Sequence, residues 1–272
     1  CPEEIRRELL ATLGLEAHDL YVIEGPIAPG RLLAILEGDD CPELRDEPFV
    51  APIVESLREG ADIFGTLRQG DLLLHHPYES FDAVLHFLQQ AAADPRVLAI
   101  KQTLYRTGTD SQVVEALTRA AANGKEVLVV IELRARFDEE ANISLANHLQ
   151  KAGAQVVYGV VGHKTHAKML LVTRREGRTL RRYGHLSTGN YNRRTAALYT
   201  DISYLTADAG ITMDMDHLFG HLASQSRLPK MKRLLVAPFQ LHADLLARIA
   251  AVGEAARRGI RTGDRVLHSA FR

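Results

Sequence analysis

The feature that most constrains the fold is an alternation of short apolar runs with amphipathic stretches between residues 71 and 226. The pattern predicts strands at 71–75, 97–104, 126–133, 154–158, 166–172, 183–186 and 202–206, and helices at 81–93, 111–123, 139–152 and 213–224. Strands and helices that alternate in this way are typical of an α/β layered domain. We therefore predict a mainly parallel sheet flanked by helices, in which the almost continuously apolar run at 126–133 is covered on both faces.

The segments on either side have weaker patterns. Residues 2–13 are expected to form a helix that stops at Gly14, residues 19–23 a strand, and another short helix is expected to begin at Arg31. Towards the other end, we expect a strand at 232–238 and an amphipathic helix at 241–257. These differences divide the chain into three parts. Residues 1–70 are expected to be the end of a preceding domain or a linker, and residues 71–228 the α/β domain. Residues 229–272 are expected to be the start of a truncated second domain or a C-terminal extension.

Composition limits the classes of function. Lys and Arg number 33 against 34 Asp and Glu, which gives a net charge of −1 and no bulk attraction to nucleic acid or to a membrane surface. Any anion site must therefore come from a local cluster of basic residues. Cys1 and Cys41 have no metal-type spacing and form no disulfide framework, and no apolar run is long enough to cross a membrane. We expect a cytoplasmic protein, and a chain that begins with Cys rather than Met is expected to be a fragment.

The candidate catalytic residues lie in the segment G-H-K-T-H-A-K-M-L-L-V at residues 162–172. His166 and Lys168 are two residues apart at the start of an apolar run, and a strand sends alternate side chains to the same face. A neutral imidazole beside an ammonium group is a nucleophile next to a fixed positive charge, which suits phosphoryl chemistry. An edge strand with Lys, His and Lys on its outer face is the structural alternative, because short H-x-K strings are common.

Further basic and polar residues follow other predicted strands. Arg106 comes directly after the strand that ends at Leu104, and Arg136 lies in the loop after residue 133. Arginines that converge from separate strand ends can hold phosphate oxygens in bidentate fashion, whereas a pairing of Arg136 with a neighbouring acid would be structural. Several other arginines crowd a predicted hairpin and are interpreted as a solvated turn: Arg174, Arg175, Arg178, Arg181 and Arg182.

Two other groups have competing interpretations. The segment S-T-G-N at residues 187–190 includes Gly189 and Asn190, which can offer backbone and side-chain donors to a phosphate. Tyr199 could stack on a base, although from the sequence alone a half-buried core tyrosine is favoured. The pair His75 and His76 has no further metal ligand at a suitable spacing, so we interpret it as structural.

Several long motifs together resemble one known family. H-H-P-Y-E-S-F, I-K-Q-T-L-Y-R, A-R-F-D-E-E-A-N-I, G-H-K-T-H-A-K and T-G-N-Y-N-R-R-T-A-A-L-Y-T-D occur in order over about residues 60–240. This set is similar to the histidine-dependent bacterial polyphosphate kinases, enzymes with phospholipase D-like catalytic domains. The resemblance implies a phospholipase D-like fold for residues 71–228, and reversible transfer of the terminal phosphoryl group of ATP to inorganic polyphosphate through a phosphohistidine.

The resemblance also implies roles for individual residues. It makes His166 the phosphorylated histidine and Lys168 the lysine of the H-x-K element, and it assigns Arg106 and Arg136 to phosphate and Mg²⁺. Tyr199 would contact the nucleotide, and Gly189 and Asn190 would form the small polar motif. The implied partners are ATP or ADP, inorganic polyphosphate and further copies of the chain in a homo-oligomer, with neither nucleic acid nor stable membrane insertion.

Two alternatives depend on departures from the family pattern. A phospholipase D-like phosphodiesterase is disfavoured because Thr173 stands five residues after Lys168, where the phospholipase pattern has Asp. A non-catalytic polyphosphate-binding module remains open, because the family has further domains that this chain does not include in full. We have no interpretation for His163, which stands where an apolar residue is expected.

Overall fold

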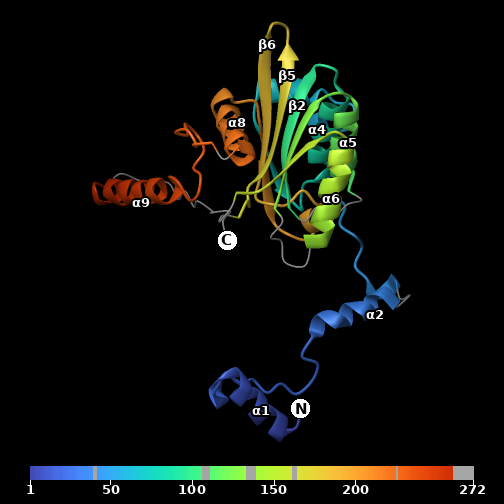
Figure 1. The fold of residues 1–272 in the computed structure, drawn as a ribbon, viewed down its shortest axis with the longest axis vertical. Coiled ribbons are helices and arrows are strands. Elements are labelled where there is room, and N and C mark those ends of the chain that lie inside the picture. The colour runs from blue at the N-terminus through green and yellow to red at the C-terminus, as the bar shows by residue number, and fades with distance from the viewer. Residues whose placement is uncertain (39–41, 106–110, 133–138, 161–163, 225, 260–272) are drawn as a thin grey trace. The chain divides into compact units, whose positions relative to one another are not determined.

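The computed structural model describes residues 1–272 except 39–41, 106–110, 133–138, 161–163, 225 and 260–272 (Figure 1). The chain divides into two compact units, residues 1–50 and residues 51–272, and each is described by itself. In the described part of the chain, no helix is both long and apolar enough to cross a membrane.

The first unit consists of short helices. Helix α1 (Glu3–Leu13) ends at Gly14, which adopts a left-handed conformation with φ of 65° and donates its N–H to the carbonyl of Ala11, as the sequence predicts. Helix α2 (Leu33–Gly38) is also present, preceded by the 3-10 helices η1 (Ala17–Asp19) and η2 (Pro29–Leu32) and followed by η3 (Pro42–Leu44). The predicted strand at 19–23 is wrong. A strand needs a neighbour for its backbone groups, and the described residues of this unit offer none.

The second unit is built on one seven-stranded sheet in the order β1-β7-β6-β5-β2-β3-β4. The strands are β1 (Leu72–His76), β2 (Val97–Leu104), β3 (Glu126–Ile131), β4 (Gln155–Tyr158), β5 (Lys168–Glu176), β6 (Thr179–Ser187) and β7 (Asp201–Thr206). The helices are α3 (Ile63–Gln69), α4 (Asp82–Ala93), α5 (Gln112–Ala122), α6 (Glu139–Lys151), α7 (Arg193–Ala196), α8 (Ala209–Ser224) and α9 (Leu241–Arg257), with the 3-10 helix η4 (Glu55–Leu57) before α3. Every strand and helix predicted between residues 71 and 226 is present, with ends shifted by up to four residues.

The α/β layered class is confirmed, but the sheet is mixed rather than mainly parallel. Only β2, β3 and β4 pair in parallel, and they are joined by the crossover helices α5 and α6. The other four pairings are antiparallel. The tight turn at Gly177, which has φ of 61°, makes β5 and β6 a hairpin, and a hairpin pairs its strands antiparallel.

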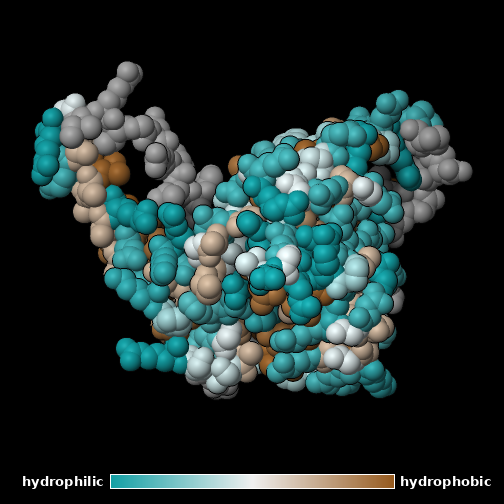
Figure 2. Space-filling model, turned by 90° about the horizontal axis from the view of Figure 1, so that it is seen from above, coloured by the Kyte–Doolittle hydropathy of each residue, from teal (hydrophilic) through white to brown (hydrophobic). Residues whose placement is uncertain are grey.

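Helices cover both faces of the sheet. Helices α4, α5 and α6 lie on one face and α8 on the other (Figure 1). Strand β3 serves both layers, because Val127 and Val129 pack in the larger core with α4 and α5, whereas Leu128 and Val130 pack in the smaller core with α8. This double coverage is the physical reason for the continuous apolar run in the sequence. The face seen in Figure 2 is largely hydrophilic, with apolar residues in small groups.

The core begins earlier than the predicted boundary at residue 71. Leu57, Ile63, Phe64 and Leu67 are each at most 2% exposed and belong to the larger core. At the other end, α9 is present as predicted and has no buried residue. The predicted strand at 232–238 is wrong: Asp214 on α8 accepts the backbone N–H groups of Lys232, Arg233 and Leu234 at 2.6–3.0 Å, so a carboxylate satisfies donors that a strand would need to pair.

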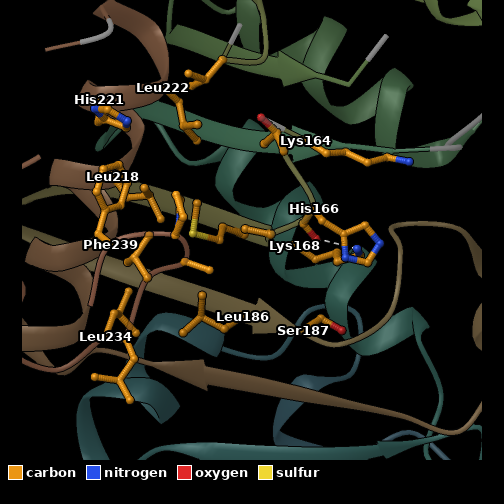
Figure 3. Close-up of a pocket in the computed structure, with 18 residues that line it drawn as sticks. Lys164, His166, Lys168, Leu186, Ser187, Leu218, His221, Leu222, Leu234 and Phe239 are labelled. Atoms are coloured by element: carbon orange, nitrogen blue, oxygen red, sulfur yellow. Dashed lines mark hydrogen bonds between the residues drawn. The ribbon is translucent and has the colours of Figure 1, made fainter. Parts of the chain in front are cut away.

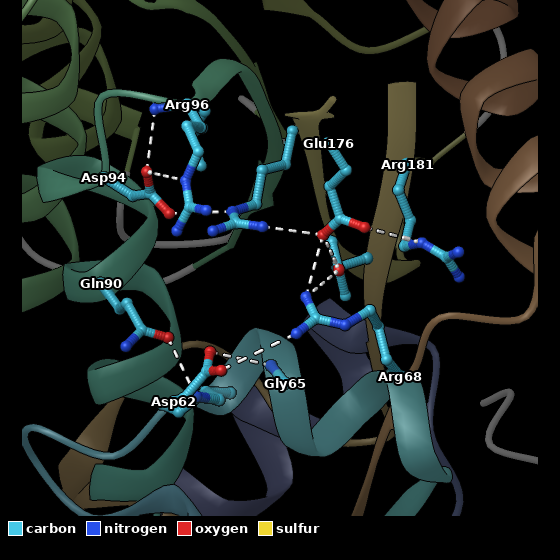
Figure 4. A network of polar contacts seen from close by, with 12 residues as sticks. Asp62, Gly65, Arg68, Gln90, Asp94, Arg96, Glu176 and Arg181 are labelled. Carbon is cyan, nitrogen blue, oxygen red and sulfur yellow. Dashed lines mark hydrogen bonds and ion pairs between the residues drawn. The ribbon is translucent and has the colours of Figure 1, made fainter. Parts of the chain in front are cut away.

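A network of ion pairs fixes the turn end of the β5–β6 hairpin (Figure 4). Arg174 is 3% exposed and donates to Asp94 at 2.8 Å and to Glu176 at 2.7 Å. Glu176 also accepts from Arg68 on α3 and from Arg181 on β6, and it contacts the hydroxyl of Tyr183. These contacts indicate structural rather than ligand-binding roles for Arg174 and Arg181. They tie α3 and the loop before β2 to the hairpin. The interpretation as a solvated turn is wrong for Arg174, because this side chain is 3% exposed and lies within strand β5.

We predict that Arg174→Ala lowers the free energy of unfolding by about 3 kcal/mol, because it leaves the carboxylates of Asp94 and Glu176 shielded from water without their shared cation. The matched control is Arg175→Ala, whose side chain is exposed and whose removal should cost less than about 0.5 kcal/mol. Urea unfolding of the two variants measures the difference. Equal losses in the two variants would contradict the structural role of the network.

Candidate active site at the start of strand β5

His166 and Lys168 lie side by side where β5 begins. Lys168 is the first residue of the strand, and its Nζ donates to the carbonyl oxygen of His166 at 2.6 Å (Figure 3). The imidazole of His166 meets the edge of the Tyr105 ring, with centroids 5.5 Å apart. The Nζ atoms of Lys164 and Lys168 lie 5.5 and 5.4 Å from the centroid of the same ring. The site thus groups one imidazole and two ammonium groups around Tyr105, a residue that sequence reasoning quoted in a motif but did not select.

The surroundings of His166 favour its neutral form. Partial burial lowers the pKa of His166 below its ordinary value of 6.5, and the nearby charges of Lys168 and Lys164 lower the pKa further, against an opposing effect of Glu132. The imidazole is therefore unprotonated at neutral pH, which is the state that a nucleophile requires.

Lys168 is nearly buried, with 6% of its surface exposed. Burial lowers its pKa to about 8, and Lys164 adds to this shift, while Asp201 on β7 opposes it. The group is therefore mostly charged at pH 7 and loses its charge a little above. A buried ammonium whose polar contact is a backbone carbonyl is well suited to meet the charge of an incoming anion.

The polar loop after β6 is held tightly against β7. Thr188 donates its hydroxyl to Asp201 at 2.7 Å, and Thr188 Oγ1 accepts the N–H of Ile202 at 2.9 Å. A Cβ atom at Gly189 would lie 2.5 Å from a carboxylate oxygen of Asp201, so only glycine fits at this position. The N–H of Gly189 donates to Ser187 at 3.0 Å, so one of the expected phosphate donors already has a partner within the protein.

The side chain of His76 is hydrogen-bonded to residues that adjoin this loop. Its Nδ1 is 2.7 Å from the carbonyl oxygen of Glu79 and its Nε2 is 2.9 Å from the hydroxyl of Ser203, which lies 3.4 Å from that of Ser187. Both ring nitrogens therefore have protein partners, and the side chain is 1% exposed. These contacts agree with a structural role for His76, whereas the side chain of His75 is exposed. The described residues contain no group of three or more His, Cys, Asp or Glu side chains that could hold a metal ion.

The remaining predicted site residues differ in their exposure and location. Tyr199 is 64% exposed, so its interpretation as a core tyrosine is wrong and its ring is accessible to a ligand. Asn190 is partly buried in the loop after β6. Arg106 and Arg136 lie outside the described residues. The strands that precede them, β2 and β3, end at the same edge of the sheet at which β5 begins, because β5 runs antiparallel to β2.

A largely apolar cavity of about 340 Å³ adjoins the pair His166 and Lys168. Figure 3 shows His166, Lys168 and Ser187 together at one end and the side chains of α8 at the other. The apolar lining includes Leu186, Leu218, Leu222, Leu234, Val236 and Phe239. Sequence reasoning missed this cavity, because one wall is residues 234–239, which are far in sequence from β5 and are placed by tertiary contacts: Asp214 holds the backbone at 232–234, and Leu234 and Val236 pack on the smaller core.

The fold and the site together define an α/β domain that presents a neutral histidine and two lysines at one sheet edge, an arrangement suited to an anionic, phosphate-bearing ligand. Comparison with known proteins identifies the family. Residues 62–228 match the sequence model of the polyphosphate kinase C-terminal domain 1. The chain belongs to the polyphosphate kinase family.

Individual relatives agree with this assignment. The chain is 54% identical over 259 residues to a polyphosphate kinase of Xylella fastidiosa and 50% identical over 262 residues to one of Pseudomonas aeruginosa, which covers 95% and 94% of this chain. It spans only 37% and 38% of the lengths of these relatives. The crystal structure of polyphosphate kinase from Porphyromonas gingivalis superposes with a TM-score of 0.74 at 31% identity, covering 95% of this chain and 41% of that one.

We predict that Gly189→Ala destabilises the domain by about 1–3 kcal/mol, since the added methyl group must displace the Asp201 carboxylate and with it the hydrogen bond from Thr188. Gly220→Ala on α8 is the matched control. A Cβ atom there meets nothing within 4 Å, and alanine should stabilise the helix by about 0.5–1 kcal/mol. Thermal and urea unfolding compare the two variants. A neutral or stabilising Gly189→Ala would contradict the close packing of the loop.

Proposed function

We propose that this chain contains the phosphohistidine site of an ATP-polyphosphate phosphotransferase. The observation that carries the proposal is the pairing of a neutral His166 with the nearly buried Lys168 at one sheet edge. Membership of the polyphosphate kinase family supports the choice of substrates.

In the first step, a ring nitrogen of His166 attacks the terminal phosphorus of ATP. A P–N bond forms, the bond from that phosphorus to the bridging oxygen breaks, and ADP leaves with the electron pair. In the second step, a terminal oxygen of polyphosphate attacks the phosphohistidine, the P–N bond breaks, and neutral His166 is regenerated. Two steps at one nitrogen let a nucleotide and a long polyanion use the same centre in turn, and the reverse sequence forms ATP.

The basic residues stabilise the charge on the transferred group. Lys168 is fixed beside His166 by its bond to the carbonyl oxygen of that residue, so its ammonium group does not need to reorganise when the phosphoryl group arrives. Lys164 adds a second, more exposed ammonium group near the same tyrosine ring. In this proposal Arg106 and Arg136 hold phosphate oxygens, and Tyr199 stacks on the base of the nucleotide through its exposed ring.

Magnesium is proposed as part of the nucleotide substrate. Guanidinium groups have no lone pair to offer a cation, so Arg106 and Arg136 suit the phosphates rather than the metal. The described residues offer no cluster of metal ligands, and Mg²⁺ in nucleotide sites is held largely by phosphate oxygens and water.

We predict that His166→Ala abolishes the acid-labile, base-stable label that forms when the chain is incubated with magnesium and γ-labelled ATP. His217→Ala on the exposed face of α8 is the control and should be labelled like the unchanged chain. Both variants should unfold within about 1 kcal/mol of the unchanged chain, since neither side chain belongs to the core. Peptide mapping locates the label. Label that persists in His166→Ala would overturn the proposal. Polyphosphate binding without any label in the unchanged chain would instead support a non-catalytic module.

The lowered pKa values predict a bell-shaped pH dependence for formation of the label. The acid limb should lie below pH 6.5, where His166 takes up a proton and loses its nucleophilic lone pair, and the alkaline limb near pH 8, where Lys168 loses its charge. Lys168→Arg stays charged and should remove the alkaline limb while leaving the acid limb in place. Rates of labelling between pH 5 and 10 measure both limbs. An alkaline limb that is unchanged in Lys168→Arg would exclude Lys168 as its source.

A further inference from the structure

Glu132 is a buried carboxylate that lies directly beside the His166 segment. It follows β3 at the sheet edge where β5 begins, and it is 4% exposed. Its Oε2 accepts the backbone N–H of Thr165, the residue before His166, at 2.6 Å. Glu132 lies outside both the H-x-K motif and the arginine-bearing loops of the sequence.

The contacts around Glu132 leave it little freedom. Asn142 on α6 donates its side-chain N–H to the backbone carbonyl of Glu132 at 3.2 Å. On the other side, a Cβ atom at Gly159 would lie 3.0 Å from Thr165 Oγ1 and 3.4 Å from Glu132 Oε2, so the glycine lets the chain after β4 pass close to this contact. The carboxylate is thus fixed between the chain after β4 and the segment that leads into β5.

Glu132 contributes a charge as well as a hydrogen-bond acceptor. The negative charge of Glu132 acts on His166 against the two lysines, since it raises the pKa of the imidazole whereas Lys168 and Lys164 lower it.

We propose that Glu132 is a positioning residue for phosphoryl transfer: it anchors the backbone before His166 through Thr165 and places a negative charge beside the imidazole. The anchor fixes where the ring lies relative to Lys168 and Tyr105. The charge offsets part of the electron-withdrawing field of the two lysines, so the lone pair of His166 stays basic enough to attack phosphorus. This inference rests on the proposed function in so far as it takes His166 to be the nucleophile.

The two contributions can be separated by two substitutions of the same residue. Glu132→Gln keeps an oxygen that accepts the Thr165 N–H but removes the charge, whereas Glu132→Ala removes both. Glu126→Gln is the matched control, because Glu126 lies at the exposed opposite end of the same strand. Among the described residues, the charged groups that act on His166 are Lys164, Lys168 and Glu132, and the ring of Tyr105 lies beside the imidazole.

The first measurement needs no turnover. NMR titration of the His166 imidazole in the full chain should give a lower pKa in Glu132→Gln than in the unchanged chain, and no change in Glu126→Gln. Lys164→Gln should move the same pKa upward, because Lys164 acts in the opposite direction. Hydrogen exchange at the Thr165 amide should quicken in Glu132→Ala and stay slow in Glu132→Gln. An unchanged His166 pKa in Glu132→Gln, or an unchanged Thr165 amide in Glu132→Ala, overturns the inference.

The second measurement is the rate of phosphohistidine formation from magnesium and γ-labelled ATP. We expect about a 100-fold loss in Glu132→Ala, in which the ring is misplaced, and partial rescue to within about 10-fold in Glu132→Gln. Equal, near-normal rates in both variants overturn the positioning role while leaving the proposed function intact. If the unchanged chain forms no label although the NMR shifts occur as expected, the proposed function fails and the effect of Glu132 on His166 is supported on its own.

Discussion

The placement of strand β5 at the centre of the sheet is the constraint on which the rest of the domain depends. Met169, Leu170, Leu171 and Val172 are each at most 2% exposed, and the strand pairs with β2 on one side and β6 on the other. Because β5 is antiparallel to β2, it starts where β2 and β3 end. His166 and Lys168 therefore stand at the edge to which the ends of β2 and β3 deliver Tyr105 and Glu132. A rigid, doubly covered strand gives the pair a fixed base, as a site for group transfer requires.

The local patterns of the sequence predicted the elements of this domain well, because each strand of residues 71–226 carries its own apolar period and each helix its own cap or glycine stop. Whether neighbouring strands pair in parallel or antiparallel was harder to predict. A continuous apolar run reports burial on both faces, and burial on both faces does not require parallel neighbours, so the hairpin of β5 and β6 was the better guide to direction. The early core residues Phe64 and Leu67 were missed because a single short helix has too few apolar positions to reveal which unit it packs on.

The candidate site shows the same contrast between what a local pattern predicts and what the fold brings together. His166 and Lys168 were predicted from a period of two, and the structure brings them together, whereas Tyr105 and Glu132 come from other strands and are joined to them only by the order of strands in the sheet. Residue type misled in the case of Tyr199, since a tyrosine that follows Leu198 and precedes a predicted strand resembles a core residue until its exposure is known. Long-range juxtaposition is set by topology, and no local pattern records it.

The two ends of strand β5 differ in how their cations are balanced, and this difference indicates where an anion would bind. At the far end, Arg174 is paired with Asp94 and Glu176, so this carboxylate-rich network already balances its charge. At the near end, the Nζ of Lys168 donates to a backbone carbonyl rather than to a carboxylate, and burial lowers the pKa of Lys168 to about 8, with Lys164 adding to the shift and Asp201 opposing it. With a net charge of only −1, the chain has no general field to attract or repel a polyanion. The local imbalance at the start of β5 is therefore what would draw phosphate to His166, and Glu132 moderates that imbalance without removing it.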